Sequence, residues 1–371
     1  MTDGEGKLNT PVFICGAYGA GNHGDEAMLK AIIASLRGID PDIPISVVTR
    51  DPARTRQRHG VGTVYTFDLP GIIAEMRKCR LYICGGGSLI QNITSRRSLY
   101  YYLAMLHLAK RCGCKTLLYG SGIGPLSGRS DIERTAKILN TCADAICLRD
   151  EMSRELLERI GVTAPEIILT ADPVLSLSAC SEDDAAEFLL KNGVDPDGKF
   201  ACFCLRQWQG LEERLGEIAA AIDYAHDTLG LTPVFVALNR TLDPDIAQKA
   251  ADAAGVACTI LAPDSAGLCM GVMKKAQLVV SMRLHGALLA AACGVPTVGI
   301  SYDPKVAGFL SYTGCGECVE LVNLTRDALI AGMARELECA GNAERCEKMK
   351  EIKAAERLNA LTAVRLLKAK G

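Results

Sequence analysis

The stretch LVVSMRLHGALLAAACGVPTVGISYDPK, residues 278–305, decides the fold of this chain. Its first residues, 278–280, form an apolar run that is typical of a buried parallel strand. A helix of small residues follows at 287–293, and Gly294 ends it. A second buried strand at 296–300 leads towards another helix. Strand, helix and strand in this order predict a parallel α/β sheet.

Polar side chains follow both of these strands. Arg283 and His285 come after the first strand, and Asp303 and Lys305 come after the second. Ligands of open α/β sheets bind at the carboxyl ends of the strands, so we expect these side chains, with Ser281, at one rim. Two cations, an imidazole and two helix N-termini suit an anionic substrate. Alternatively, His285 caps a helix and Arg283 pairs with a surface acid, but four such residues together favour a binding site.

Length and composition limit the class of protein. A chain of 371 residues is typical of two domains, and 49% hydrophobic with 23% charged residues is an ordinary globular composition. The net charge of −2 argues against nucleic-acid binding. No apolar run approaches about 18 residues, and the polar N-terminus lacks a signal-peptide core. We therefore expect a cytoplasmic protein.

The 17 cysteines are expected to be reduced. Most lie in apolar strands or helices, where cysteine acts as a small hydrophobic residue. Cys315 and Cys318 form one CxxC motif without a matching second pair, so we do not expect a zinc site. We expect neither a metal nor another cofactor.

A glycine-rich turn follows the first predicted strand, residues 12–15, and leads into a helix. Such a turn lets a ligand approach backbone N–H groups at the positive end of the helix. The spacing is neither a dinucleotide GxGxxG nor a P-loop. The turn residues that we expect to contact a ligand are Gly19, Asn22, Gly24, Asp25 and Glu26. The alternative is a tight turn in which Asp25 is the N-cap.

Two further predicted strands, residues 81–84 and 116–119, also end in glycine. Three consecutive glycines at 85–87 are unfavourable in backbone entropy, which indicates close approach of either a ligand or another backbone. A strand at 145–148 ends at Arg149. The ligand contacts that we expect here are Gly86, Gly87, Ser88, Ser121 and Gly122.

Strands and helices alternate throughout the chain, which predicts right-handed crossovers and parallel sheets. We place an N-terminal Rossmann-like domain at residues 1–178 and a second one at 179–371. The second domain starts a new series with a strand at 200–205 that ends at Arg206. It finishes with a long helical segment, and such a helix often packs back across a domain junction.

The ordered set of motifs resembles the polysaccharide pyruvyl transferase family, specifically its CsaB-type bacterial members. The resemblance covers about residues 12–310 and rests on GAGNHGDEA at 19–27, GGGS at 85–88, GIGP at 122–125, Arg149-Asp150 with Ser153, ADP at 171–173, and SMRLH at 281–285 through SYDPK at 301–305.

The resemblance implies two Rossmann-like domains that face each other across a cleft, a GT-B-like fold. It implies transfer of the pyruvyl group from phosphoenolpyruvate onto two hydroxyls of a sugar, giving a ketal. For the CsaB type, the implied acceptor is a lipid-linked precursor of the secondary cell-wall polymer that contains β-N-acetylmannosamine. That polymer anchors S-layer-type proteins. The functional arginine, histidine and lysine of the family fall on Arg149, His285 and Lys305.

These residue types fit the implied chemistry. Arginine binds a carboxylate or a phosphate in a bidentate fork, so Arg149 is assigned to one anion, with Arg206 and Arg283 as further candidates. His285 is the candidate general acid–base because imidazole exchanges protons near neutral pH. Lys305 would neutralise charge on the leaving phosphate. The sequence leaves open whether Asp25 and Glu26 activate a hydroxyl or only charge a helix N-terminus.

The chain departs from the common family pattern at three positions. Asn92 stands where aspartate is common, Ser121 replaces a common glutamine, and Gly286 replaces a larger residue. We expect these differences to affect the acceptor more than the reaction. Two other functions stay open: a GT-B glycosyltransferase that uses a nucleotide sugar, and a sugar-binding protein without catalysis.

A short basic patch follows the second predicted strand. Arg54, Arg56 and Arg58 form it, and such a patch is usually a solvated helix face. It could instead lie near lipid phosphates and give peripheral contact with a membrane surface that carries the lipid-linked acceptor.

Overall fold

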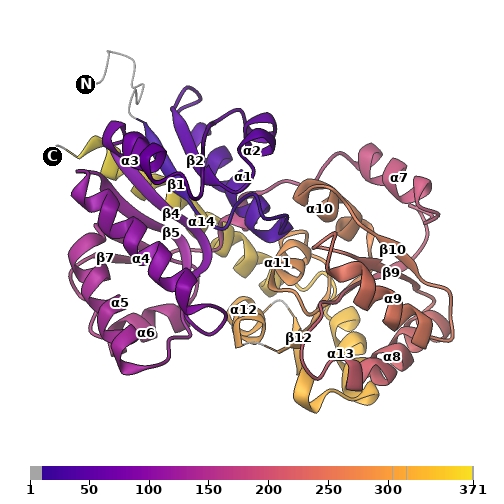
Figure 1. Cartoon of the computed structure of the whole chain (residues 1–371). Helices are drawn as coiled ribbons and strands as arrows, with labels where there is room; N and C mark the ends of the chain where they lie inside the picture. Colours follow the sequence, from indigo (N-terminus) through magenta and orange to yellow (C-terminus); the bar gives the residue numbers. More distant parts are fainter. Residues whose placement is uncertain (1–10, 303, 315, 370–371) are drawn as a thin grey trace. The chain divides into compact units, whose positions relative to one another are not determined.

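The computed structural model describes residues 11–302, 304–314 and 316–369 (Figure 1). These residues divide into two compact units. The first unit comprises the described part of Met1–Ala20, with Asp25–Ser176 and the described residues from Ile352 onward. The second unit comprises Gly21–Gly24 and Leu177–Glu351. No helix within the described ranges combines the length and the apolar character needed to cross a membrane.

The first unit is built on a parallel sheet whose strands have the order β3-β2-β1-β4-β5-β6-β7. Its central strands are buried on both faces, as their continuous apolar sequences require. The strands are β1 (Val12–Cys15), β2 (Ile45–Thr49), β3 (Gly62–Tyr65), β4 (Leu81–Ile90), β5 (Lys115–Ile123), β6 (Ala145–Leu148) and β7 (Glu166–Leu169).

Helices connect these strands, and their N-termini lie at the carboxyl edge of the sheet. Several start at a capping side chain that accepts a hydrogen bond from the first turn, among them Asp51, Asp68, Ser95 and Asp150. The helices are α1 (His23–Arg37), α2 (Pro52–His59), α3 (Leu69–Lys78), α4 (Arg96–Arg111), α5 (Arg129–Cys142) and α6 (Glu151–Arg159), followed after β7 by the 3-10 turn η1 (Pro173–Ser176).

The second unit has a parallel sheet with the strand order β10-β9-β8-β11-β12-β13. Its strands are β8 (Phe200–Cys204), β9 (Thr232–Val236), β10 (Thr259–Leu261), β11 (Leu278–Ser281), β12 (Thr297–Ser301) and β13 (Glu317–Glu320). Its helical elements are α7 (Glu182–Lys191), η2 (Glu212–Arg214), α8 (Leu215–Asp227), α9 (Asp243–Ala253), α10 (Ala266–Lys275), α11 (Leu284–Ala292), α12 (Pro304–Thr313), η3 (Leu321–Asn323) and α13 (Arg326–Glu338).

The prediction of two Rossmann-like α/β domains is confirmed, and residues 278–305 form β11, α11, β12 and the start of α12. The helix α11 begins at Leu284, so His285 lies inside its first turn. Each sheet has an apolar core in which buried strands pack against the inward faces of the helices.

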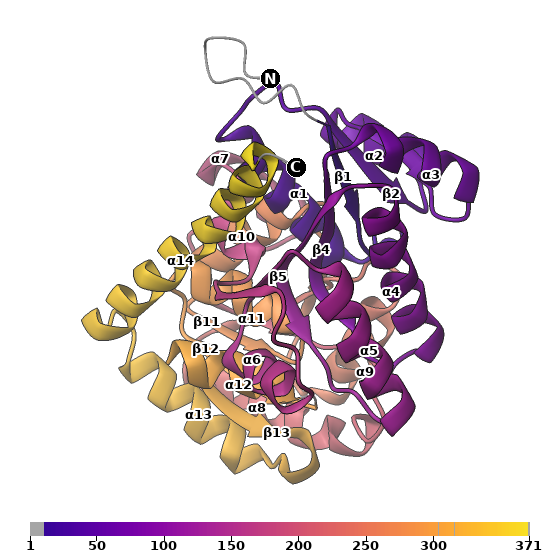
Figure 2. The same ribbon diagram turned by 90° about the vertical axis from the view of Figure 1, so that its left-hand side faces the viewer.

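The final helix α14 (Ala343–Lys368) differs from the expected domain assignment. It is one continuous helix (yellow in Figure 2), but its residues from Ile352 onward belong to the first unit. Asn359 explains why, because it accepts a hydrogen bond from Thr170 Oγ1 (2.9 Å) and donates one to the Ala171 carbonyl (3.0 Å). Arg365 also pairs with Glu166 of β7 at 2.5 Å. A long final helix that packs back was expected, but the residue from which it belongs to the first unit leaves no signal in the local sequence pattern.

Candidate active site

The carboxyl edge of the first sheet contains a buried arginine held on several sides. Arg149 follows β6 directly, and its Nη1 donates to Asp172 Oδ2 at 2.6 Å. Its Nη2 donates to Ser88 Oγ at 3.0 Å, and its Nε lies 3.6 Å from Asp150 Oδ2. The guanidinium is therefore oriented from three directions. The sequence reasoning placed Arg149 and Ser88 in the site but missed Asp172 as the orienting partner.

A glycine allows this close arrangement. A Cβ atom at Gly122 would lie 2.9 Å from both Arg149 Nε and Ser88 Oγ, so a side chain there would displace the guanidinium. The neighbouring Ser121 accepts a hydrogen bond from the Arg149 backbone N–H through its carbonyl (3.2 Å). The structure thus brings together four predicted site residues: Ser88, Ser121, Gly122 and Arg149.

The three glycines lie within β4 and not after it, because the strand continues beyond its expected end at residue 84 to Ile90. They have two different explanations. A Cβ at Gly85 would lie 2.5 Å from Tyr18 Oη, and one at Gly86 would lie 2.0 Å from Met28 Cγ, so these two positions serve close packing. Gly87 has a φ of +75°, which favours glycine, and a Cβ there would lie 3.9 Å from its nearest neighbours, at Asp25 and Met28. Packing therefore accounts for Gly86, while Gly87 keeps open space beside Asp25.

The glycine-rich turn after β1 is closed by Glu26. Its Oε1 accepts a hydrogen bond from the Gly19 N–H at 2.7 Å, and its Oε2 lies 3.9 Å from His59 Nε2. Burial by itself raises the pKa of Glu26, but the contacts with His59 and Gly19 outweigh burial and lower it. A structural contact therefore uses this carboxylate, which disfavours Glu26 as a hydroxyl-activating base.

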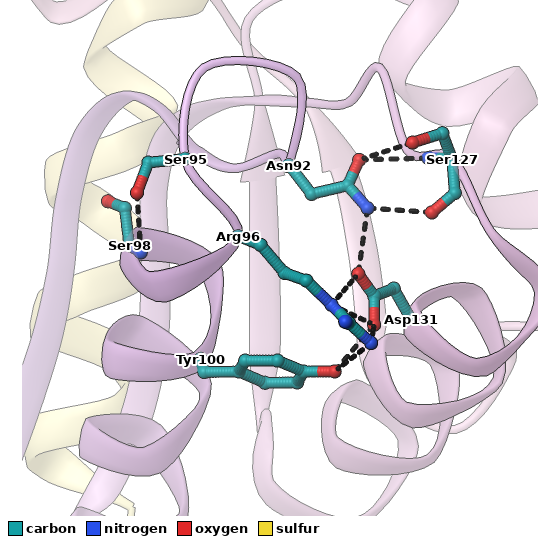
Figure 3. Close-up of polar contacts among 7 residues, drawn as sticks. All are labelled: Asn92, Ser95, Arg96, Ser98, Tyr100, Ser127 and Asp131. Atoms are coloured by element: carbon teal, nitrogen blue, oxygen red, sulfur yellow. Dashed lines mark hydrogen bonds and ion pairs between the residues drawn. The ribbon is translucent and has the colours of Figure 1, made fainter.

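A polar network ties together the two loops that follow β4 and β5 (Figure 3). Asn92 Nδ2 donates to Asp131 Oδ2 (2.9 Å), while Asn92 Oδ1 accepts from the Ser127 N–H (2.9 Å). Asp131 also accepts hydrogen bonds from Arg96 and Tyr100. Arg96, Tyr100 and Asn92 together lower the pKa of Asp131. An asparagine is needed at position 92 because an aspartate could not donate to a carboxylate, which explains one departure from the family pattern.

The second unit places an arginine among aromatic rings at the carboxyl edge of its sheet. Arg206 follows β8, and its Nη1 donates to Tyr302 Oη at 2.5 Å. Its guanidinium carbon lies 5.2 Å from the ring centroid of Trp208 and 5.0 Å from that of Tyr302. Arg206 Nε is buried and has no hydrogen-bond partner among the described residues. The sequence reasoning included Arg206 but missed both aromatic residues, which only the fold brings together.

A second arginine of this edge pairs with an acid. Arg283 forms a salt bridge with Asp243 of α9, a buried residue and not the surface acid considered above. Arg283 Nε is buried without a hydrogen-bond partner within the described residues. Ser281 Oγ accepts from the Arg283 N–H (3.1 Å) and donates to the Arg283 carbonyl (2.8 Å), so the buried serine shapes this turn. A Cβ at Gly286 would lie 2.3 Å from that hydroxyl, which explains the glycine.

His285 lies in the first turn of α11 but is not its cap. The N-cap is Arg283, and the helix has no side-chain cap hydrogen bond. Gly24 belongs to the same unit, and a Cβ there would lie 2.2 Å from His285 Nδ1, so glycine is required for this approach. Asn22 accepts a hydrogen bond from the Gly24 N–H at 3.2 Å.

Some predicted positions fall outside this description. Asp303 and Cys315 lie outside the described residues, as does the side chain of Lys305, whose backbone is in the first turn of α12. Within the part of the chain that the structure describes, no group of three or more His, Cys, Asp or Glu residues is arranged to hold a metal ion.

Two Rossmann-like domains, each built on a parallel sheet, are the architecture of the GT-B class. The fold is similar to that of UDP-GlcNAc 2-epimerase from Methanocaldococcus jannaschii, with a TM-score of 0.66 and 14% identity over 95% of this chain and 99% of that chain. It is also similar to HepE from Anabaena in complex with UDP-glucose, with a TM-score of 0.58 and 11% identity over 97% of each chain. At these identities the likeness shows the fold alone.

The polysaccharide pyruvyl transferase family model matches residues 22–304. The chain therefore belongs to the polysaccharide pyruvyl transferase family, which confirms the family that its motifs predict. It is similar to the amylovoran biosynthesis protein AmsJ of Erwinia amylovora, with 21% identity over 380 residues that cover 86% of this chain and 90% of that protein. The CsaB-type subgroup stays a prediction.

Proposed function

We propose that this protein transfers the pyruvyl group of phosphoenolpyruvate onto two hydroxyls of an N-acetylhexosamine, forming a ketal and releasing phosphate. The acceptor is β-N-acetylmannosamine in a lipid-linked precursor of the secondary cell-wall polymer, as in the CsaB type. The enzyme works in the cytoplasm at the membrane surface, and its product takes part in S-layer anchoring. Membership of the pyruvyl transferase family supports the reaction class.

The observation that carries the proposal is the set of arginine N–H groups at the carboxyl edges of the sheets. Phosphoenolpyruvate has a carboxylate and a phosphate, and guanidinium binds both types of group with paired N–H donors. Arg206 has no carboxylate partner among the described residues, and both Arg206 and Arg283 keep a buried Nε that no described group accepts from. We assign these two to the anionic groups of the donor. Arg149, which Asp172 and Ser88 orient, is the third anion-binding residue.

The chemistry requires a proton and two attacks at one carbon. His285 as imidazolium protonates the methylene carbon of phosphoenolpyruvate while a sugar hydroxyl attacks C2 and loses its proton to Asp25. Phosphate then leaves C2 with the proton that Asp25 has taken up, and Lys305 neutralises its charge. The second hydroxyl attacks the same carbon and returns a proton to His285, which closes the ketal. We assign the remaining substrate contacts to Gly19, Asn22 and Gly24 of the glycine-rich turn, and to Gly87 and Asp303.

The test is phosphate release from phosphoenolpyruvate with a panel of nitrophenyl and lipid-linked N-acetylhexosamines. We expect phosphate release that depends on the acceptor, together with a ketal product detected by mass spectrometry. Absence of turnover with every N-acetylhexosamine would overturn the acceptor class, and absence of any use of phosphoenolpyruvate would overturn the reaction.

One observation favours a second candidate, a glycosyltransferase that uses a nucleotide sugar. Trp208 is partly exposed, and its ring lies 4.4 Å from that of Tyr302, an arrangement on which a nucleobase could stack. The same acceptor panel with UDP-sugars distinguishes the two functions. Release of UDP with glycoside formation would support the second candidate.

A further inference from the structure

The corner of the first sheet where β3 ends exposes three large apolar side chains within five residues. Tyr65, Phe67 and Leu69 are 45%, 70% and 54% exposed. The Asp68 N–H donates to the Tyr65 carbonyl at 2.9 Å, so a tight turn carries Phe67 at its tip. The rings of Tyr65 and Phe67 meet edge to face with centroids 5.6 Å apart. Loop tips are normally polar, so grouped apolar side chains at such a site indicate contact with a partner.

Arginine side chains surround this turn. The Thr66 N–H donates to the carbonyl of the residue before Arg50 (3.0 Å), which places the exposed Arg50 beside the turn. Arg54 is exposed in the first turn of α2. Tyr101 Oη donates to the Thr66 carbonyl at 3.5 Å, and the exposed Arg97 lies four residues before Tyr101, on the same face of α4.

Two carboxylates, Asp51 and Asp68, lie near these arginines and cap helices. Asp51 Oδ1 accepts from the Arg54 backbone N–H (3.0 Å) and caps α2, while Asp68 Oδ1 accepts from the Gly71 N–H (3.1 Å) and caps α3. Within the described ranges, none of the three arginines forms an ion pair with an acid. The surface therefore combines exposed apolar side chains with three arginines, which outnumber the two carboxylates and leave an excess of positive charge.

The course of helix α2 decides which arginines of the predicted basic patch (Arg54, Arg56 and Arg58) belong to this surface. The helix starts at the carboxyl edge and runs away from it, so Arg54 lies near the turn and Arg58 lies more than a helical turn further off. Arg56 donates to Thr63 Oγ1 at 3.0 Å, in the middle of β3. Arg50, Arg54 and Arg97 are therefore the arginines that belong to this surface.

We propose that this surface, formed by Tyr65, Phe67 and Leu69 with Arg50, Arg54 and Arg97 at its rim, binds an anionic lipid bilayer. Aromatic and aliphatic side chains on a protruding turn enter the headgroup region, and arginines around them meet lipid phosphates. A stable protein interface covers about 800 Å² and about 20–30 residues of each partner, whereas this surface is formed by six side chains.

The place of the surface fits the proposed function. The turn follows the carboxyl end of β3, so it lies on the same edge of the sheet as Ser88, near the end of β4, and Arg149, after β6. A bilayer at this edge would present a lipid-linked acceptor to the substrate-binding loops of the first unit. Only this presentation of the acceptor rests on the proposed function, since binding of the protein to lipid requires neither donor nor turnover.

The test is cosedimentation of the full chain with sucrose-loaded vesicles, in the absence of phosphoenolpyruvate. We expect binding to vesicles that contain phosphatidylglycerol, weaker binding to phosphatidylcholine alone, and a loss of about tenfold or more in the double variant Phe67→Ser, Leu69→Ser. Arg50→Gln with Arg54→Gln should abolish the preference for phosphatidylglycerol. Val322→Ser is the matched control, because Val322 is also 70% exposed but belongs to the second unit.

Three results would overturn the inference. They are no vesicle binding by the wild type, equal binding by the Phe67→Ser, Leu69→Ser variant, and a change of oligomeric state in that variant, which would assign the surface to a protein partner.

Activity on a water-soluble nitrophenyl acceptor separates this inference from the proposed function. The variant should match the wild type there and lose activity only on vesicle-borne acceptor, whereas a wild type inactive on every acceptor would overturn the proposed function and leave the vesicle result standing.

Discussion

Each of the two sheets ends in an arginine–aspartate pair at its carboxyl edge, but the two pairs are built differently. In the first unit, the side chains of Arg149 and Asp172 are 6% and 4% exposed, and Ser88 and Asp150 also face the guanidinium. In the second unit, Arg283 is 14% exposed and Asp243 1% exposed, and Arg283 Nε has no hydrogen-bond partner among the described residues. The first arginine is surrounded by acceptors, whereas the second retains a free donor.

The net charge around the two pairs also differs, and it is more negative around Arg149 than around Arg283. Two aspartates face Arg149, so the net charge of that cluster is negative. Arg283 faces one aspartate, and Arg206 on the same edge has aromatic rings beside it instead of an acid. The comparison teaches that an arginine at a strand end can serve as a positioned structural cation or as a ligand donor. We assign orientation chiefly to the first edge and anion binding chiefly to the second.

The largest expected effect tests whether the proton chemistry belongs to the second unit. His285→Gln keeps a hydrogen-bonding side chain but cannot carry a proton near neutral pH. We expect kcat to fall by about 10²–10⁴-fold with little change in phosphoenolpyruvate binding, because general acid–base catalysis supplies about that factor. Steady-state kinetics and donor-binding calorimetry measure the two quantities.

The matched control for that variant is His59→Gln in the first unit. His59 contacts Glu26 in the turn after β1, and glutamine can keep such a contact, so kcat should stay near that of the wild type. If the folded His285→Gln enzyme turns over normally and His59→Gln does not, the chemistry belongs to the first unit and the comparison is reversed.

A buried acid behind the first pair gives the next effect. Glu356 of α14 is buried, and burial together with the charge of Asp172 raises its pKa from 4.5 to about 7. Since the folded-state pKa is above the unfolded one, the contribution to stability is fully present below about pH 4.5 and is lost as the pH rises through 7. Glu356→Gln should therefore raise the free energy of unfolding at pH 8 by up to about 3 kcal/mol and should have little effect near pH 4.5.

Glu336→Gln in the second unit is the control, and we expect it to change the free energy of unfolding at pH 8 in the opposite direction. Glu336 is equally buried, but it pairs with Arg345 at 2.8 Å, so the neutral side chain should lower stability at pH 8. Urea unfolding of both variants at the two pH values measures the contrast. A Glu356→Gln variant that is less stable than the wild type at pH 8 would contradict the claim that ionised Glu356 destabilises the fold.

The third prediction compares the two arginine sites directly. Arg206→Lys keeps the charge but removes the planar guanidinium that lies over Trp208 and Tyr302. We expect the KM for phosphoenolpyruvate to rise about ten- to hundredfold, equivalent to about 1.5–3 kcal/mol, with little change in melting temperature. Arg149→Lys should reduce activity and also lower the melting temperature, because it breaks the contacts with Asp172 and Ser88.

Kinetics and thermal unfolding of the two lysine variants decide between the roles. If Arg149→Lys raises the KM for the donor at unchanged stability while Arg206→Lys leaves KM unchanged, anion binding belongs to the first edge.

The sequence predicted the strand ends because they depend on local patterns. An apolar run closely followed by arginine marks the carboxyl ends of β6, β8 and β11, which is why Arg149, Arg206 and Arg283 were found. Glycine was a wrong signal for the ends of β4 and β5, because both strands continue through their glycines. Their partners were not, because Asp243 lies 40 residues from Arg283 and Asp172 lies 23 residues from Arg149. Only strand order brings such residues together. The same holds for Trp208 and Tyr302, and for the hydrogen bonds of Asn359 with Thr170 and Ala171 that hold α14 to the first unit.

The smallest expected effect concerns how the loops of the first edge are held in place. Asn92→Asp exchanges an amide that donates to Asp131 for a carboxylate that repels it. The Asn92 Oδ1 contact with the Ser127 N–H is kept, so we expect folding to persist with a melting temperature lower by about 2–4 °C. The new carboxyl beside Asp131 should have a raised pKa, so the deficit should shrink as the pH falls and that group becomes protonated.

Asn140→Asp is the control for Asn92→Asp. It separates the effect of the Asp131 charge from a general effect of replacing asparagine by aspartate. Asn140 Oδ1 accepts from the backbone N–H groups of Thr163 and Ala164 at 2.8 and 2.9 Å, contacts that a carboxylate also makes. Its Nδ2 donates to a carbonyl, not to a carboxylate, so this variant should lose less than Asn92→Asp and show a weaker dependence on pH. Equal losses at neutral pH would mean that the Asp131 charge is not what requires an amide at position 92. A larger loss in Asn92→Asp that disappears on acidification would establish that the network in Figure 3 depends on an amide, and that the loops of the first edge are held by charge as well as by packing.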